Sequence, residues 1–227
     1  MDKRFQRSEM LFGTEKMNKL KNSGVIVFGA GGVGGAVIEA LARSGVGCIA
    51  VVDNDTVDVT NINRQILATD ATVGVRKALA AKERIHLICP QTEVEIFDMF
   101  YLPDNADEID LTRYDYIVDA IDTVSAKIEL ICRASALNIP IISCMGTGNK
   151  IHPEMLEISD ISKTSVCPLA RVMRRELRNR GIDRLNVLYS REQPLATSSR
   201  VPASSSFTPP VAGYLIASKV IRDLVDL

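Results

Sequence analysis

The chain has 227 residues, of which 46% are hydrophobic and 24% are charged, a composition typical of one globular domain with a sizeable core. The formal net charge is −1 and tryptophan is absent. These values argue against a protein that coats nucleic acid non-specifically or binds it mainly by base stacking. A charged amino terminus and the lack of long apolar runs predict neither a secretory signal nor a membrane-spanning helix, so we expect a cytoplasmic protein.

The predicted elements alternate between strand and helix in the first part of the chain. Short β-branched runs predict buried strands, and apolar residues at helical spacing predict the helices between them. In chain order we predict strand 24–29, helix 33–43, strand 48–52, helix 78–88, strands 94–97 and 116–121, helix 124–138 and strand 139–145. Strands separated by helices imply right-handed crossovers and a mainly parallel sheet.

The sequence changes in character after Gly148. Short strands are predicted at 155–159 and 186–190, on either side of a helix from about 168 to 180. A long Ser/Pro-rich loop at 197–210 precedes a closing helix at 211–225. We predict one Rossmann-like α/β domain over 1–227, with helices on both faces of the sheet and a mixed extension at its carboxyl-terminal end. Its nucleotide-binding half would cover about 1–148 and its substrate-side half about 149–227.

A Gly-x-Gly-x-x-Gly motif joins the first predicted strand to the first helix. Such glycines permit a tight turn and let backbone N–H groups approach a phosphate at the helix amino terminus. Asp53 follows at the end of the next strand, where a carboxylate can bond ribose hydroxyls. The motif predicts a nucleotide but does not distinguish ATP from NAD, and glycines that serve only packing are the alternative. The glycines are Gly29, Gly31, Gly32 and Gly34.

Acids, amides and cations gather downstream of the ribose position. An enzyme that cleaves a triphosphate needs cations to neutralise charge on the phosphoryl groups, whereas a hydride-transfer enzyme does not. Asp122 ends the fourth strand and could hold magnesium through oxygen ligands. The alternatives are solvated surface charges for the cations and a strand-end cap for Asp119. The gathered residues are Asp55, Asn61, Arg64, Gln65 and Lys77.

Taken together and in this order, the motifs resemble the ubiquitin-activating-like (ThiF/MoeB-type) superfamily. The motifs are Gly29 to Gly34, Asp53-x-Asp55, Asn61-x-x-Arg64-Gln65, Lys77 and Asp119-x-x-Asp122. The resemblance implies that Asp53 binds ribose, that Asn61, Arg64 and Lys77 contact the phosphates, and that Asp122 coordinates Mg²⁺. Arg7 matches an arginine that reaches the ATP of the opposite subunit in this superfamily, which implies a homodimer.

The second half resembles the tRNA threonylcarbamoyladenosine dehydratase branch of that superfamily. The likeness lies in 145–153, 158–164, 168–170, 188–192 and 204–207. Sulfur-carrier branches often hold structural zinc with two Cys-x-x-Cys pairs, whereas the five scattered cysteines here form none, so we expect no zinc. The resemblance implies an enzyme that uses ATP to activate a carboxylate on a modified tRNA base and closes that side chain into a ring.

The helix after Pro168 carries a candidate RNA-binding face. Its four arginines are spaced i, i+3, i+4 and i+7, which places them on one side of a helix, where they could bind phosphates in a salt-dependent manner. A solvated face is the alternative. The candidate RNA-binding residues are Lys163, Arg171, Arg174, Arg175 and Arg178. His152 is a weaker candidate for the substrate site, and Cys167, the one cysteine outside an apolar run, would count as reactive only if its pKa were low.

Three other functions remain open from the sequence. One is an adenylyltransferase acting on the carboxyl-terminal Gly-Gly of a sulfur-carrier protein. Another is an NAD-dependent oxidoreductase. The third is a non-catalytic nucleotide-binding partner, which the full set of phosphate-site residues disfavours. No residue pattern points to or against a sulfur-transfer partner.

Overall fold

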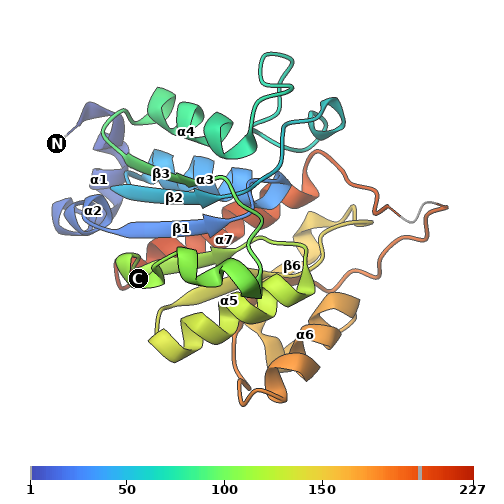
Figure 1. Ribbon diagram of the computed structural model, residues 1–227. Helices are drawn as coiled ribbons and strands as arrows, with labels where there is room; N and C mark the ends of the chain where they lie inside the picture. The colour runs from blue at the N-terminus through green and yellow to red at the C-terminus, as the bar shows by residue number, and fades with distance from the viewer. Residues whose placement is uncertain (1, 199–200) are drawn as a thin grey trace.

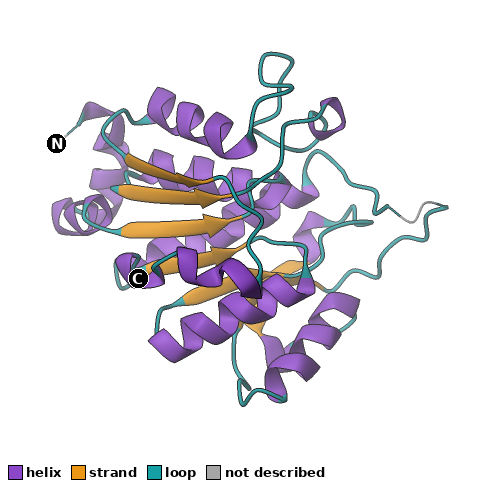
Figure 2. Cartoon of the chain, in the orientation of Figure 1, coloured by secondary structure: helices purple, strands orange, loops and turns teal. Residues whose placement is uncertain are grey.

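The computed structural model describes residues 2–198 and 201–227, which form a seven-stranded sheet covered by helices on both faces (Figures 1 and 2). The strand order is β3-β2-β1-β4-β5-β7-β6. Neighbouring strands run parallel except β6, which is antiparallel to β7. The strands are β1 (Gly24–Phe28), β2 (Cys48–Val52), β3 (Glu93–Phe97), β4 (Tyr116–Asp119), β5 (Ile141–Cys144), β6 (Leu156–Asp160) and β7 (Asn186–Ser190). The predicted fold class is confirmed, including its mixed carboxyl-terminal end.

The central strands are apolar throughout because both of their faces are covered. Every residue of β1 is buried. Val25 and Val27 belong to the core cluster shared with α3 (Gly32–Ser44), α4 (Lys77–Ile88) and α7 (Thr208–Leu224). Ile26 and Phe28 point the other way, into the cluster shared with α5 (Val124–Leu137). Successive side chains of β1 therefore point into two different cores, so the strand is apolar at every position.

Helix α7 returns from the carboxyl-terminal end of the chain to pack along α3 (Figure 1). The two helices approach closely at Gly213, where a Cβ atom would lie 2.4 Å from the carbonyl oxygen of Val33. Helix α7 begins at Thr208, three residues before the predicted start at 211. Prolines tolerated in the first helical turn explain the difference, because they carry no N–H that the helix needs there.

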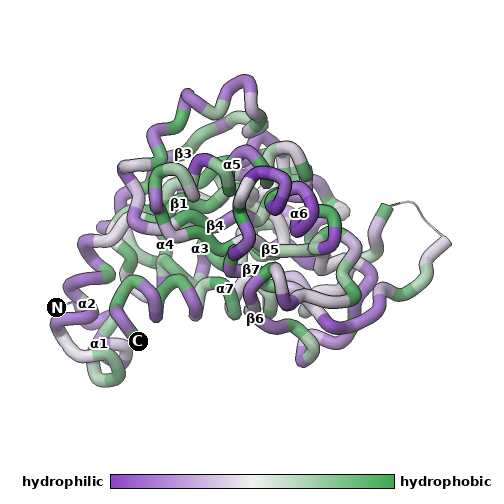
Figure 3. Tube along the Cα trace, turned by 90° about the horizontal axis from the view of Figure 1, so that it is seen from below, coloured by the Kyte–Doolittle hydropathy of each residue, from purple (hydrophilic) through white to green (hydrophobic). Residues whose placement is uncertain are grey.

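The substrate-side half adds a smaller cluster on the α5 face. Helix α6 (Pro168–Arg178) buries Ala170, Met173 and Leu177 against α5 and β7. Much of α6 is hydrophilic, as Figure 3 shows. The predicted helix ran to residue 180, two residues beyond the observed end.

Two short helices at the amino terminus were not predicted. They are α1 (Gln6–Phe12), which has no fully buried residue, and α2 (Thr14–Lys21), which buries only Met17 and Leu20. Because so few of their residues are buried, these helices show no regular spacing of apolar residues from which they could be predicted. Residues 199–200 of the predicted loop lie outside the described residues. Within the described ranges, no helix is long and apolar enough to cross a membrane.

Candidate active site

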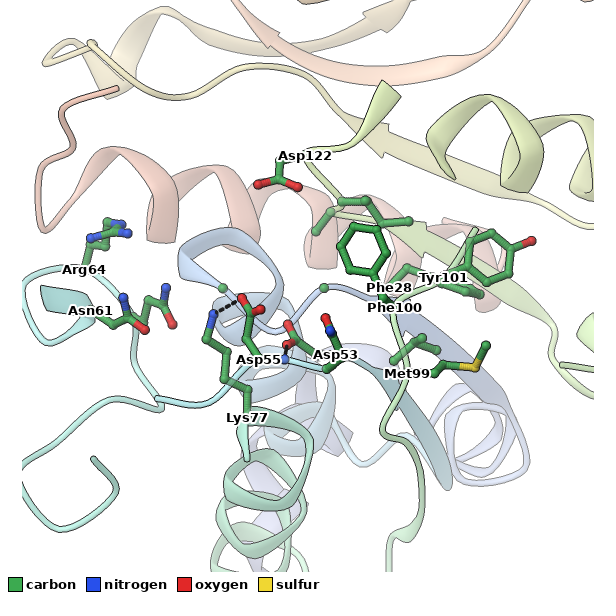
Figure 4. Close-up of a pocket in the computed structure, with 17 residues that line it drawn as sticks. Phe28, Asp53, Asp55, Asn61, Arg64, Lys77, Met99, Phe100, Tyr101 and Asp122 are labelled. Atoms are coloured by element: carbon green, nitrogen blue, oxygen red, sulfur yellow. Dashed lines mark hydrogen bonds and ion pairs between the residues drawn. The ribbon is translucent and has the colours of Figure 1, made fainter. Parts of the chain in front are cut away.

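A pocket of about 330 Å³ opens at the carboxyl ends of β1, β2 and β4 (Figure 4). The chain leaves β1 toward β2 on one side and returns to β4 on the other, which makes this the topological switch point of the sheet. Ligands of open parallel sheets bind at that point. Most of the predicted nucleotide residues line the pocket: Gly29, Gly31, Asp53, Asp55, Asn61, Arg64, Gln65, Lys77 and Asp122.

The four glycines of the motif have two different roles. Gly29 has a φ of 92°, which favours glycine, and a Cβ atom there would lie 2.7 Å from the carbonyl oxygen of Ala120. Gly34 lies against the backbone of Gly29, and Gly32 against the side chain of Pro209. Gly29 and Gly31 line the pocket, whereas Gly32 and Gly34 are not among the described lining residues. The structure thus places the latter two where close packing, rather than a ligand, requires glycine.

Asp53 fastens the glycine turn to the end of β2. Its carboxylate accepts hydrogen bonds from the backbone N–H of Ala30 (2.7 Å) and that of Asp55 (2.8 Å). Burial raises the pKa of Asp53, while these bonds and the nearby Lys77 oppose the rise. A carboxylate held in this way, with a face toward the pocket, can still accept a ribose hydroxyl.

Two cations border the pocket from the segment that follows β2. The Lys77 ammonium, at the start of α4, donates to Asp55 at 2.8 Å. The Arg64 guanidinium donates to the Thr60 carbonyl and to Asn63, at 2.9 Å each. Figure 4 shows both cations with Asp122 around the same space. Asp55 is exposed, so its contact with Lys77 is one that a phosphate could replace.

The amide of Gln65 fits a ligand that donates hydrogen bonds. Its Oε1 atom is buried and has no hydrogen-bond partner among the described residues. Buried acceptors are normally satisfied, so this one calls for a donor in the pocket. Nucleotides carry such donors on their ribose hydroxyls and on the amino group of adenine. Asn61, by contrast, accepts from the backbone N–H of Asp58 at 3.2 Å and caps a short turn.

Asp122 is an exposed carboxylate on the loop after β4. No group of three or more His, Cys, Asp or Glu side chains that could hold a metal occurs within the described residues. Mg²⁺ is commonly held by one or two carboxylates together with the phosphate oxygens of its nucleotide. A single carboxylate at the edge of a pocket bordered by cations is therefore compatible with a magnesium ion that a nucleotide brings with it.

The segment after β3 supplies a wall that the sequence analysis missed. Met99, Phe100 and Tyr101 line the pocket with Phe28, and the Phe28 and Tyr101 rings meet edge to face at 4.8 Å. Burial raises the pKa of the Tyr101 hydroxyl to about 12. This segment leaves the sheet at its carboxyl edge, so its position after a predicted strand was a signal that could have identified it.

Arg7 lies away from this pocket. It is exposed on α1, whose neighbour Phe5 packs against Gly45 at the turn before β2. That turn is at the amino edge of the sheet, opposite the pocket. Arg7 is absent from the described residues that line the pocket of its own chain.

The predicted arginine face is split by the structure. Arg174 turns inward and donates to the carbonyl oxygen and hydroxyl of Thr164 at 2.9 and 2.7 Å. Arg175 pairs with Glu176, and Arg178 lies 3.7 Å from Asp183. Arg171, Arg175 and Arg178 are exposed on α6, and Lys163 is exposed before it.

The two weaker candidates lie outside the described pocket lining. His152 is half exposed, with its Nδ1 atom 2.8 Å from Glu154. Cys167 is buried at the amino-terminal cap of α6.

The sheet, its switch-point pocket and the cations around it define a nucleotide-binding protein of the Rossmann-like α/β class. Its glycine turn and its Asp53, Arg64 and Lys77 side chains all meet at one edge. The ThiF family model matches residues 5–226, and the chain belongs to the ThiF family.

Known relatives extend this result. The chain is 41% identical over 239 residues to the tRNA threonylcarbamoyladenosine dehydratase of Bacillus subtilis, covering 97% of this chain and 94% of the relative. Crystal structures of the Escherichia coli tRNA N6-threonylcarbamoyladenosine dehydratase with AMP and with ATP match with TM-scores of 0.93 and 0.92. Each is 32% identical to this chain, covering 98% of it and 94% of the other chain. The resemblance inferred from the motifs is confirmed.

Proposed function

We propose that this chain is an ATP-dependent tRNA threonylcarbamoyladenosine dehydratase. The observation that carries the proposal is the full-length similarity to the Bacillus subtilis enzyme, which leaves almost no part of either chain unmatched. The pocket supports it, because its lining supplies a glycine turn, a carboxylate for ribose and two cations. The carboxylate suits the ribose of ATP, and the glycine turn and the cations suit its phosphates.

The proposed chemistry uses the cations around the pocket and the reactive groups of the substrate itself. A carboxylate oxygen of the modified base attacks the α-phosphorus of ATP, and the bond to pyrophosphate breaks. Arg64 and Lys77 are placed to neutralise the charge that develops on the departing phosphates. A nitrogen of the same side chain then attacks the activated carbonyl carbon and loses its proton, while AMP leaves with one carboxyl oxygen. The base loses one water overall. The attacking nitrogen and the activated carbonyl carbon belong to the same side chain, so the reaction needs no nucleophile from the enzyme.

The remaining pocket residues fit binding roles. Asp53 would hold the ribose, and Asn61 and Gln65 would lie along the nucleotide. Asp122 would hold Mg²⁺ together with phosphate oxygens, and the ion would supply further charge neutralisation. Within the single domain, we assign nucleotide binding to about 1–148 and substrate binding to about 149–227.

The proposed working unit is a homodimer in the cytoplasm. Arg7 projects from α1 away from its own pocket, as it must if it serves the ATP of a second copy. Met10 and Leu11 on the same helix are 82% and 76% exposed. Apolar side chains this exposed beside a functional arginine support a contact with another subunit.

The proposed tRNA surface is the outer side of α6. Its exposed Arg171, Arg175 and Arg178 suit a phosphate backbone. Arg171 lies in the first turn, close to the carboxyl edge, because Cys167 at the helix start lies next to Gly146 beyond β5.

The test is ATP-dependent release of pyrophosphate by the purified chain. We expect tRNA that bears threonylcarbamoyladenosine to stimulate release, whereas the same unmodified transcript and a Gly-Gly carrier protein do not. Mass spectrometry of the product nucleoside, handled under mild conditions, should show a loss of one water. Stimulation by the carrier protein alone, or binding of NAD in place of ATP, would contradict the proposal.

A further inference from the structure

A buried ion pair lies directly behind the part of the pocket wall that carries Asp122. Lys127, in the first turn of α5, and Asp119, at the end of β4, both have fully buried side chains, with Nζ and Oδ2 separated by 2.9 Å. Neither is among the described residues that line the pocket. Burying two charges costs several kcal/mol per ion, and apolar residues of the same volume often stabilise a fold equally well. The pair therefore calls for a reason beyond stability.

The Lys127 ammonium contacts three oxygen atoms of the protein. Besides Asp119, its ammonium donates to the carbonyl oxygens of Ile121 (3.1 Å) and Cys144 (2.8 Å). The ammonium thus makes two hydrogen bonds to carbonyl oxygens and one ion pair with Asp119. The residue thus joins the loop after β4 to the last residue of β5.

Asp119 completes the arrangement from the other side. Its Oδ1 accepts the backbone N–H of Ile121 at 3.1 Å, and its Oδ2 accepts the Ser143 hydroxyl at 2.5 Å. Both backbone polar groups of Ile121 are therefore held by the ion pair, the N–H by Asp119 and the C=O by Lys127. Asp122 is the next residue, so the direction of its side chain depends on the peptide that this pair fixes.

We propose that Lys127 is a positioning residue that, with Asp119, holds Asp122 toward the nucleotide phosphates and their metal ion. This inference rests on the role proposed above for Asp122. The bonds to Cys144 and Ser143 connect the same ion pair to β5, the strand that precedes the substrate-side half. One buried charge pair thus fixes both the peptide before Asp122 and the end of β5.

The test compares a double variant with a matched control. The variant Lys127→Met with Asp119→Asn removes both charges, which avoids leaving an unpaired ion in the core. The control, Tyr116→Phe, removes a buried hydroxyl at the far end of β4 that donates to Asp223 at 2.9 Å. ATP affinity is measured by calorimetry with excess Mg²⁺ and with a chelator, together with the melting temperature.

We expect the double variant to bind ATP in the presence of chelator about as tightly as the wild type. The gain in affinity that Mg²⁺ gives the wild type should fall about 10- to 100-fold, the usual effect of losing a group that orients a metal ligand. The control should keep the full gain even where its melting temperature falls.

An unchanged gain in the double variant would overturn the inference, as would a wild type whose ATP affinity does not respond to Mg²⁺. Should the double variant fail to fold, Lys127→Arg provides the second measurement. It keeps the charge but not the geometry, and a full gain with Mg²⁺ in that variant also overturns the inference. If the wild type shows the gain but tRNA does not stimulate pyrophosphate release, the proposed function fails while the positioning role stands.

Discussion

The carboxyl edge of the sheet is built in two different ways on its two sides. Around β1 and β2, several of the contacts that hold the pocket join near neighbours in the sequence, such as Asp53 with Asp55 and Arg64 with Thr60. Beyond β5 and β7, distant segments hold each other. Asn149 donates its backbone N–H to the carbonyl of Ala203 (2.8 Å), and its side chain accepts the N–H of Ala203 (2.6 Å).

The difference shows in backbone conformation as well. Asn149 has a φ of 58° and Val166 a φ of 62°. Left-handed conformations are uncommon for non-glycine residues, and for a β-branched residue they cost energy that the surrounding contacts must offset. Local motifs therefore contribute more to the nucleotide side, whereas contacts between distant segments contribute more to the substrate side.

The largest expected effect comes from breaking the local side. Lys77→Ala should lower turnover by a factor on the order of 10² to 10³, because it removes a cation that faces developing phosphate charge. The free energy of unfolding should change little, since the Asp55 carboxylate is exposed and stays hydrated without its lysine partner. Steady-state kinetics and thermal melting measure the two quantities. Lys82→Ala, on the same helix, is the control, and an equal loss there would contradict the assignment.

Removing a long-range contact on the substrate side should mainly lower the free energy of unfolding. Asn149→Ala loses the side-chain bond to Ala203 and forces alanine into a left-handed conformation, at a combined cost of about 2 kcal/mol. Asn149→Gly loses the bond alone, so it should cost about 1 kcal/mol. Urea unfolding measures both. Equal costs for the two variants would mean that the conformation at this position carries no strain.

Helix α6 divides into residues expected to bind RNA and one expected to support the fold. Arg171→Ala with Arg178→Ala should reduce the slope of log affinity for tRNA against log salt by about 1 to 2, since each phosphate contact contributes roughly 0.7 to 0.9. Arg174→Ala should leave the slope unchanged and lower the unfolding free energy by about 1 to 2 kcal/mol, because it uncovers the Thr164 carbonyl. Binding titrations at several salt concentrations separate these outcomes.

The smallest effect concerns a thiol. Burial raises the pKa of Cys144 from 9.0 to about 12, so the folded chain keeps this thiol protonated where an unfolded chain would ionise. Native protein at pH 8 should leave Cys144 unalkylated, while the half-buried Cys132 reacts. As pH rises above 9, this thiol should cost the fold stability, because the unfolded chain releases its proton first. Peptide mass mapping after iodoacetamide treatment measures the labelling, and early labelling of Cys144 would contradict its burial.

The same contrast explains what the sequence could predict. The strands and the main helices follow from apolar period and turn chemistry, which act over a few residues. The pocket residues from Gly29 to Lys77 were predicted from short motifs and from the family resemblance that those motifs carry. The inward turn of Arg174 does not follow, because its partner at Thr164 lies on a different element and helical spacing alone places it with Arg171. Lys127 is similar. Nothing in its neighbourhood along the chain marks a lysine as fully buried, and only the meeting of β4 with β5 makes its site.

The packing of α7 on the glycine turn has a consequence for how the protein is made. Residues 29–34 are synthesised well before Pro209, whose side chain lies against Gly32, and before Gly213, which lies against Val33. Until then α3 lacks the helix that covers it. We expect the nascent chain to have no formed ATP site, so that cellular ATP can stabilise the finished protein but cannot guide its folding during translation.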